Sequence, residues 1–107
     1  MELNEYQELA IKEAFYENRD IAYNALGISG ESGEIADHVK KMLRDDGGEL
    51  TEERREVLKK ELGDVLWYVS SMAESLGFSL DEVAKANIKK IQDRKSRGVQ
   101  HGSGDNR

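Results

Sequence analysis

The sequence predicts an all-α protein that folds as a single four-helix bundle-like domain, and three observations lead to this class. The 107 residues include no proline, which would break a helix interior, while Glu, Lys, Leu and Ala are abundant. Apolar residues recur at helical spacing in four stretches that polar or glycine-containing breaks separate. The breaks are short, and short connections usually join antiparallel neighbours in a compact bundle.

The first two helices are expected over residues 5–17 and 21–44. Asn4 and Gln7 stand three residues apart at the start of the first stretch, as in a capping box, so Asn4 is expected to cap that helix. Asp20 ends the polar break between the stretches and is expected to cap the second helix.

Glycines and a threonine bound the third helix. Asp45-Asp46-Gly47-Gly48 is the clearest loop signal in the chain. Thr51 follows this loop and is expected to cap a helix that begins at Glu52 and stops before Gly77.

Ser79 and Glu82 form another capping box, which predicts a fourth helix that runs to about Arg97. Residues 98–107 contain glycine and polar residues and are expected to form a flexible C-terminal tail. The expected organisation is therefore one folded domain over residues 1–97 followed by this tail.

Charge and composition exclude several classes of protein. The formal net charge is −6, with 9 basic against 20 acidic residues over 1–84 and 7 against 2 over 85–107. An acidic body argues against a nucleic-acid binder, which should present a dominant basic face. The absence of cysteine excludes disulfides and thiolate metal sites. No apolar run is long enough for a membrane span, and no signal peptide is recognisable, so we expect a cytoplasmic protein.

A nine-residue pattern occurs twice in the chain. Glu31-Ser-Gly-Glu34-Ile-Ala-Asp-His-Val aligns with Glu61-Leu-Gly-Asp64-Val-Leu-Trp-Tyr-Val, thirty residues later. Each copy carries two acids at i, i+3 beside an apolar stripe. At about 100° per residue, both acid pairs lie at the edge of their stripes and not on the far solvent face.

Packing of the two stripes would bring the four carboxylates together. Two such charges ~4 Å apart repel by ~4 kcal/mol at the effective dielectric of a protein surface, which is large against a domain stability of ~5–15 kcal/mol. An all-oxygen acidic site selects a hard divalent cation, and Mg²⁺ in particular combines protein carboxylates with substrate phosphates. Glu31, Glu34, Glu61 and Asp64 are therefore the candidate metal ligands.

Other interpretations of the acids compete with a metal site. Glu-rich helices often have solvated acidic faces, and an acidic ridge on a helical, non-catalytic interaction module would bind a partner protein. A redox di-metal bundle needs Glu-x-x-His on two helices. Ile35 stands three residues before His38 where such a motif needs an acid, and the third helix has no histidine, so that class is excluded.

At these residues the chain resembles the all-α nucleoside triphosphate pyrophosphohydrolases of the MazG type. Their hallmark is Glu-x-x-Glu on one helix and Glu-x-x-Asp on the next, separated by a variable loop, and the resemblance covers residues 20 to 97. It implies cleavage of an NTP or dNTP between the α and β phosphates, which gives a monophosphate and pyrophosphate. It implies Mg²⁺ as cofactor, with Mn²⁺ as a substitute, and Glu34 as the acid that accepts a proton from water, although the four acids cannot be ranked from sequence.

The resemblance also suggests substrate contacts, each with a plain structural alternative. Lys41 could steady phosphate charge or be a solvated lysine, and the Tyr68 ring could stack on the base or belong to the core. The family points similar polar positions of the fourth helix into the nucleotide site, and the alternative is a solvated basic face. The candidates on that helix are Asn87, Lys90, Arg94 and Arg97, and Arg107 could join them from the tail.

Two further features concern packing and assembly. Trp67 falls on the polar side of the third helix, and an exposed aromatic there predicts an oligomer contact. Family members are commonly dimers or tetramers, so we expect a homo-oligomer that associates through its helices. Gly27, Gly30 and Gly33 lack the lysine and the preceding strand of a phosphate-binding loop, and close helix packing is the better explanation for them.

Overall fold

A computed structural model describes residues 1–14 and 21–107, and within these ranges it contains four helices and no strand. The helices are α1 (Leu3–Lys12), α2 (Ile21–Asp45), α3 (Glu52–Leu76) and α4 (Leu80–Ser96). The predicted all-α class is confirmed. The expected cap of α2, Asp20, lies outside the described residues. Within the described part of the chain, no helix combines the length and the apolar character that crossing a bilayer requires.

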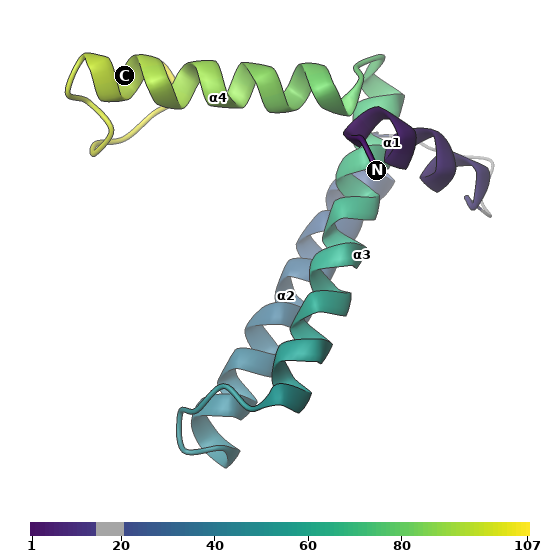
Figure 1. Cartoon of the computed structure of the whole chain (residues 1–107), viewed down its shortest axis with the longest axis vertical. Coiled ribbons are helices and arrows are strands. Elements are labelled where there is room, and N and C mark those ends of the chain that lie inside the picture. Colours follow the sequence, from purple (N-terminus) through teal and green to yellow (C-terminus); the bar gives the residue numbers. More distant parts are fainter. Residues whose placement is uncertain (15–20) are drawn as a thin grey trace.

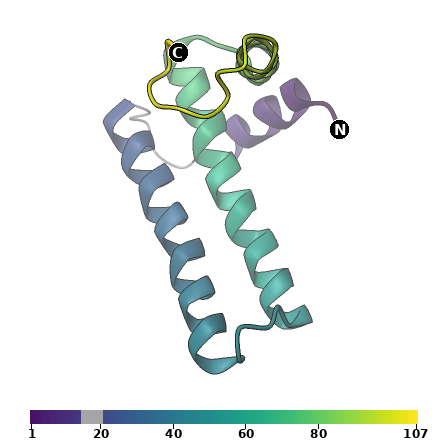
Figure 2. The same ribbon diagram turned by 90° about the vertical axis from the view of Figure 1, so that its left-hand side faces the viewer.

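α2 and α3 form a long antiparallel hairpin (Figures 1 and 2). Each helix has 25 residues, which corresponds to a length of about 37 Å. Ile35 and Val39 of α2 and Val65 and Val69 of α3 belong to the predicted apolar stripes and are half-buried. Most of the packing between helices in the structure is along this pair.

The predicted ends of α3 are confirmed. Gly47 and Gly48 have φ angles of 64° and 77°, in the left-handed region where glycine is favoured, and they let the chain turn back after α2. The Thr51 hydroxyl accepts a hydrogen bond from the main-chain N–H of Arg54 at 3.1 Å. Gly77, with φ 80°, ends the helix in the left-handed conformation.

The expected cap of α1 was wrong. The helix begins at Leu3, two residues early, with Glu2 at the cap position, and its helical residues end at Lys12. Asn4 and Gln7 instead cap α4: Asn4 Oδ1 accepts from the main-chain N–H of Asp81 at 3.1 Å, and Gln7 Oε1 accepts from that of Leu80 at 2.8 Å. A capping-box pattern specifies acceptors near a helix start, but it does not specify which helix they serve.

The four helices pack pairwise and do not close into the compact bundle that short connections favoured. α1 packs on α3 and α4. α4 runs away from the hairpin at the end opposite the loop that joins α2 to α3, and it makes no contact with the described part of α2 (Figure 1). The radius of gyration is 16.6 Å, against ~13 Å for a compact domain of about 100 residues. The first turn of α4 is held by the side chains of Asn4 and Gln7 from α1.

Very little apolar surface is buried inside the single chain. Among the described residues, the buried apolar side chains are Ala10, Ala73 and Leu80. Large apolar side chains are exposed on every long helix, including Leu26 and Leu43 of α2, Leu62 and Leu66 of α3, and Val83, Ile88 and Ile91 of α4. This buried apolar core is small for a domain of 107 residues.

Candidate metal centre

The hairpin brings acids from α2 and α3 into two groups that share one residue. Ligand oxygens of Glu31, Glu61 and Asp64 all lie within 4.8 Å of one another. Ligand atoms of Glu34, His38 and Glu61 form a second group at the same mutual distance. Glu61 belongs to both groups, so the structure places all four sequence-predicted acids around a single carboxylate.

The antiparallel pairing of two i, i+3 motifs explains this arrangement. Each motif spaces its acids by about one helical turn, so both side chains lie on the same side of their helix. Because α2 and α3 run in opposite directions, Glu31, the first acid of its motif, lies beside Asp64, the second acid of the other. Glu34 correspondingly lies beside Glu61. Glu31 and Glu61 are half-buried, whereas Glu34 and Asp64 are exposed to solvent.

Burial and mutual repulsion both disfavour the ionised form of Glu31. Burial, followed by the negative charges of Asp64 and Glu61, raises the pKa of Glu31 above its ordinary value. The pKa of Tyr6 on α1 is also raised, first by burial and then by the charge of Asp64, so α1 places a phenol within the electric field of the acids. No spacing rule in the sequence pointed to Tyr6, because it comes from a separate helix.

Sequence reasoning also missed the position of His38 beside the acids. Its Nε2 lies 3.4 Å from Glu61 Oε1, and the two side chains are 20% and 17% exposed. The available signal was that His38 follows Glu34 by four residues and therefore shares its helix face. The three-residue spacing of the redox di-metal motif pairs His38 with Ile35 instead and so does not point to this contact.

Lys41 does not point at the acid groups. Its Nζ lies 2.8 Å from one oxygen of Asp37, and Lys40 Nζ lies 2.9 Å from the other. These two ion pairs lower the pKa of Asp37 to about 2. In the single chain, Lys41 is thus held by a neighbour on its own helix.

Tyr68 is half-buried in the seam between α2 and α3. Its ring lies over Gly27, where an added Cβ would come within 2.3 Å of two ring carbons, so only glycine fits there without a shift. The rings of Tyr23 and Tyr68 have centroids 6.2 Å apart. The close-packing explanation thus holds for Gly27, whereas nothing in the described chain lies within 4 Å of a Cβ built at Gly30 or Gly33.

Trp67 is half-buried, so the expectation of an exposed aromatic was wrong. It lines a small gap with Ala10 and Ile11 of α1 and Ser71 of α3. Its ring meets that of Tyr68 edge to face at 5.1 Å. The helical-wheel argument failed because α1 covers the side of α3 that the wheel treats as solvent.

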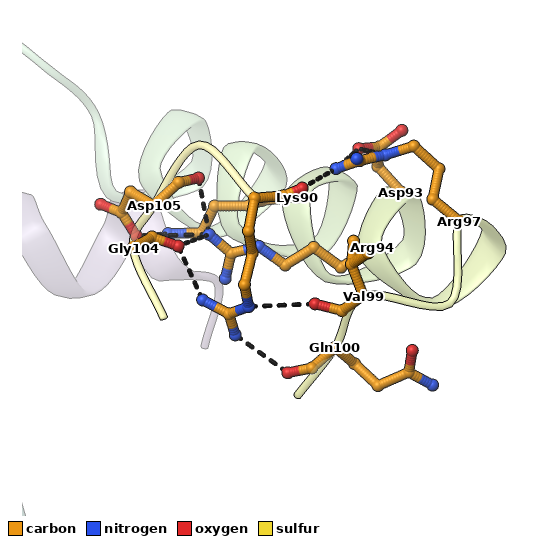
Figure 3. A network of polar contacts seen from close by, with 9 residues as sticks. Lys90, Asp93, Arg94, Arg97, Val99, Gln100, Gly104 and Asp105 are labelled. Atoms are coloured by element: carbon orange, nitrogen blue, oxygen red, sulfur yellow. Dashed lines mark hydrogen bonds and ion pairs between the residues drawn. The ribbon is translucent and has the colours of Figure 1, made fainter. Parts of the chain in front are cut away.

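The cations of α4 lie away from the acid groups and hold the residues that follow the helix (Figure 3). Arg94 Nη2 donates to the main-chain oxygen of Asp105 at 2.7 Å, and Asp105 Oδ1 lies 3.3 Å from Lys90 Nζ. Arg97 Nε donates to Asp93 Oδ2 at 2.9 Å. The side chain of Asn87 is exposed and lines a groove with Phe78, Glu82, Val83, Ala86 and Lys90.

Residues 98–107 return along α4 as a loop. The Arg107 guanidinium donates to the main-chain oxygens of Val99, Gln100 and Gly104 at 3.0, 2.9 and 2.7 Å, and Arg97 donates to the main-chain oxygen of Arg107. Positive φ angles at Gly98 and Gly104 allow the reversal. The flexibility expected of this tail stays a prediction.

Two comparable helices that pair Glu-x-x-Glu with Glu-x-x-Asp across an antiparallel seam define a class of all-α nucleotide hydrolase sites. The model of the MazG nucleotide pyrophosphohydrolase domain matches residues 20–99, and the chain therefore belongs to this family. The chain is also 52% identical over 87 residues to the Gene 37 protein of Mycobacterium phage L5, a match that spans 81% of this chain and 76% of that protein. No solved structure matches the chain significantly.

Proposed function

We propose that this protein hydrolyses nucleoside or deoxynucleoside triphosphates between the α and β phosphates and releases a nucleoside monophosphate and pyrophosphate. Family membership supports nucleotide pyrophosphohydrolase activity in general. The observation that carries the proposal is the meeting of Glu31, Glu34, Glu61 and Asp64 in the α2–α3 seam, with Glu61 common to both groups. Solvated acidic faces would not require this convergence, in which Glu31 and Glu61 are half-buried.

The donor set fits a hard divalent cation. Three carboxylates supply oxygen atoms within 4.8 Å of one another. Burial, followed by the charges of Asp64 and Glu61, raises the pKa of Glu31, and a cation at this position would offset both effects. Oxygen ligands of this kind suit Mg²⁺, with Mn²⁺ as a substitute. When bound, the cation supplies charge neutralisation for the phosphates and lowers the pKa of a bound water.

Within this proposal the four acids have two roles, metal binding and proton acceptance. Glu31, Glu61 and Asp64 form the all-carboxylate group and hold the cation. Glu34 also contributes to metal binding, and it is exposed, which leaves its carboxylate accessible to a water at the mouth of the site. We assign to Glu34 the acceptance of the proton from the attacking water.

The proposed substrate contacts require more than one chain. Tyr68 follows Asp64 by one turn on α3, and its ring would have to leave its place over Gly27 to pack on the base. Lys41 would have to leave Asp37 to reach a phosphate. Asn87, Lys90, Arg94 and Arg97 lie on α4, which makes no contact with the described part of α2. A second copy would bring these α4 residues toward the acids of its neighbour.

A homo-oligomer, a dimer or a tetramer, also accounts for the apolar surface. The exposed Leu62 and Leu66 of α3 and Ile88 and Ile91 of α4 would be covered by another chain. Burial of apolar area stabilises by roughly 25 cal/mol per Å², and the small core leaves much of this stabilisation to assembly. We expect the oligomer to act in the cytoplasm on free nucleotides, without nucleic-acid or membrane partners.

The decisive experiment measures pyrophosphate release from each common NTP and dNTP with Mg²⁺ and with EDTA. We expect Mg²⁺-dependent release from at least one nucleotide, with the monophosphate as the second product. Release of inorganic phosphate instead would place the cleavage elsewhere. No release from any nucleotide would leave the acidic interaction module as the better explanation, and Mg²⁺ would then not change the melting temperature.

A further inference from the structure

His38 reaches across the hairpin to the carboxylate that both acid groups share. It comes from α2, and its Nε2 lies 3.4 Å from Oε1 of Glu61 on α3. Both side chains are largely covered, with 20% and 17% of their surface exposed. The contact therefore joins the two helices inside the seam and is shielded in part from solvent competition.

The other ring nitrogen of His38 determines which nitrogen carries the proton. Arg54 Nη1 lies 3.5 Å from His38 Nδ1. A guanidinium can only donate, so Nδ1 acts as the acceptor in this arrangement, and the proton of a neutral ring then resides on Nε2. Nε2 lies 3.4 Å from Glu61 Oε1, and an ionised carboxylate can only accept.

Arg54 is itself held in place. Its Nε donates to Asp46 Oδ2 at 2.9 Å, and both side chains are 21% exposed. Asp46 stands in the loop just before the left-handed Gly47, and the main-chain N–H of Arg54 is fixed by the Thr51 cap. A row of contacts thus runs from the hairpin loop through Arg54 and His38 to Glu61.

We propose that His38 is a positioning residue that fixes the Glu61 carboxylate for cation binding, an inference that rests on the proposed metal site. A carboxylate shared by two acid groups is repelled by its neighbours and would rotate away without a donor on one side. The His38 N–H holds Oε1, which leaves the remaining electron pairs of Glu61 for the cation. Outer partners of this kind orient metal ligands and set their affinity.

Direct ligation by His38 is the competing role. A ligating nitrogen must give up its proton and turn a lone pair to the metal. In the structure, Nε2 lies 3.4 Å from Glu61 Oε1 and Nδ1 lies 3.5 Å from the Arg54 guanidinium, so a cation bound to His38 would have to displace one of these contacts. Mg²⁺ also prefers oxygen over imidazole nitrogen.

The test uses Mn²⁺ binding to the full chain, followed by electron paramagnetic resonance of the free ion. His38→Leu is expected to raise the Mn²⁺ dissociation constant on the order of tenfold or more. His38→Gln keeps an N–H donor and an acceptor in similar places, and it should restore most of the affinity. The matched control is His101→Leu, the same change at the other histidine of the chain, which should bind Mn²⁺ as the unaltered protein does.

Two further measurements separate positioning from folding and from ligation. Circular dichroism of His38→Leu without metal should show an intact helical fold, and His38→Gln keeps the test valid if His38→Leu unfolds. Spin-echo spectra of bound Mn²⁺ should lack the coupling of a directly bonded nitrogen. Such a coupling, or undiminished affinity in both His38 variants, would overturn the proposal.

The outcomes also distinguish this inference from the proposed function. If the unaltered protein binds no Mn²⁺, the metal site and the role of His38 both fail. If it binds Mn²⁺ with the expected loss in His38→Leu but releases no pyrophosphate from any nucleotide, the positioning role stands and the proposed reaction fails.

Discussion

The side-chain oxygen of Gln7 accepts a hydrogen bond from the main-chain N–H of Leu80 at 2.8 Å, and this buried contact joins α1 to the start of α4. The amide nitrogen of the same side chain donates to the main-chain oxygen of Phe78 at 2.9 Å. One glutamine therefore holds both sides of the turn from which α4 departs. The direction of α4, and with it the position of the α4 cations, depends on this residue.

Gln7→Ala should destabilise the protein by about 1–3 kcal/mol, because it leaves the buried N–H of Leu80 without its acceptor. Asn4→Ala is the matched control, since Asn4 makes a similar contact to the N–H of Asp81 at an exposed position. This variant should lose less stability than Gln7→Ala. Urea unfolding followed by circular dichroism measures both. Equal losses in the two variants would contradict a special role for the buried contact.

Gly27→Ala should destabilise the α2–α3 seam by about 1–3 kcal/mol, because the new methyl group would overlap the Tyr68 ring. Gly30→Ala, on the same helix and with open space around its Cβ, should instead stabilise the helix by up to about 1 kcal/mol. Thermal melting of the two variants gives opposite shifts if Tyr68 packs as described. A similar small rise in melting temperature in both variants would show that the Tyr68 ring moves aside without loss of stability.

The periodicity of the sequence was sufficient to predict the hairpin and its acids. The loop glycines, the Thr51 cap and the Gly77 stop depend on interactions within a few residues, so local patterns identified them. The convergence of Glu31 with Asp64 followed from pairing two equal motifs in antiparallel helices. These features needed no knowledge of how the rest of the chain folds.

Contacts between distant segments were not predictable in the same way. Whether Gln7 caps its own helix or α4 depends on where the chain places α4, 73 residues later. The burial of Trp67 depends on α1 lying over α3, which a helical wheel cannot include. The pairing of His38 with Arg54 required the register of the hairpin and the position of its loop.

The tail contacts predict a protected loop. Arg107→Ala removes the donors to the main-chain oxygens of Val99, Gln100 and Gly104, so amide hydrogen exchange over residues 98–107 should accelerate while exchange in α2 and α3 stays unchanged. Arg55→Ala, an exposed arginine on α3 paired only with Glu52 in the described chain, serves as control. Rapid exchange in the unaltered tail would support the flexible tail that the composition suggested.

Glu31→Gln should reveal the repulsion among the acids through its pH dependence. The pKa of Glu31 in the folded protein is raised above its ordinary value of 4.5, so the stability linked to its protonation is fully present below pH 4.5 and is lost as the pH rises through the folded pKa. Without metal, the variant should therefore gain stability over the unaltered protein as the pH rises toward 7. Below pH 4.5 the difference should vanish.

Urea titrations in EDTA at several pH values measure this difference, with Glu53→Gln as a control outside both acid groups. Addition of Mg²⁺ at pH 7 should reverse the order, because the cation stabilises the complete set of carboxylates and binds the variant less well. A difference between the proteins that does not change with pH would mean that neither burial nor the neighbouring charges raise the pKa of Glu31.

Glu61→Gln should abolish turnover without unfolding the protein. Glu61 belongs to both acid groups, so its loss should lower Mg²⁺-dependent pyrophosphate release by more than the ~10–100-fold that removal of an outer partner costs. The uncharged amide also relieves repulsion in the seam, so the melting temperature in EDTA should be equal or higher, while stabilisation by Mg²⁺ should disappear.

Glu56→Gln, on the same helix and paired with Lys59 at the surface, should keep both activity and the response to Mg²⁺. A variant at Glu61 that melts early in EDTA would show instead that the carboxylate serves the fold, because its contact with His38 would then outweigh the repulsion of the neighbouring acids.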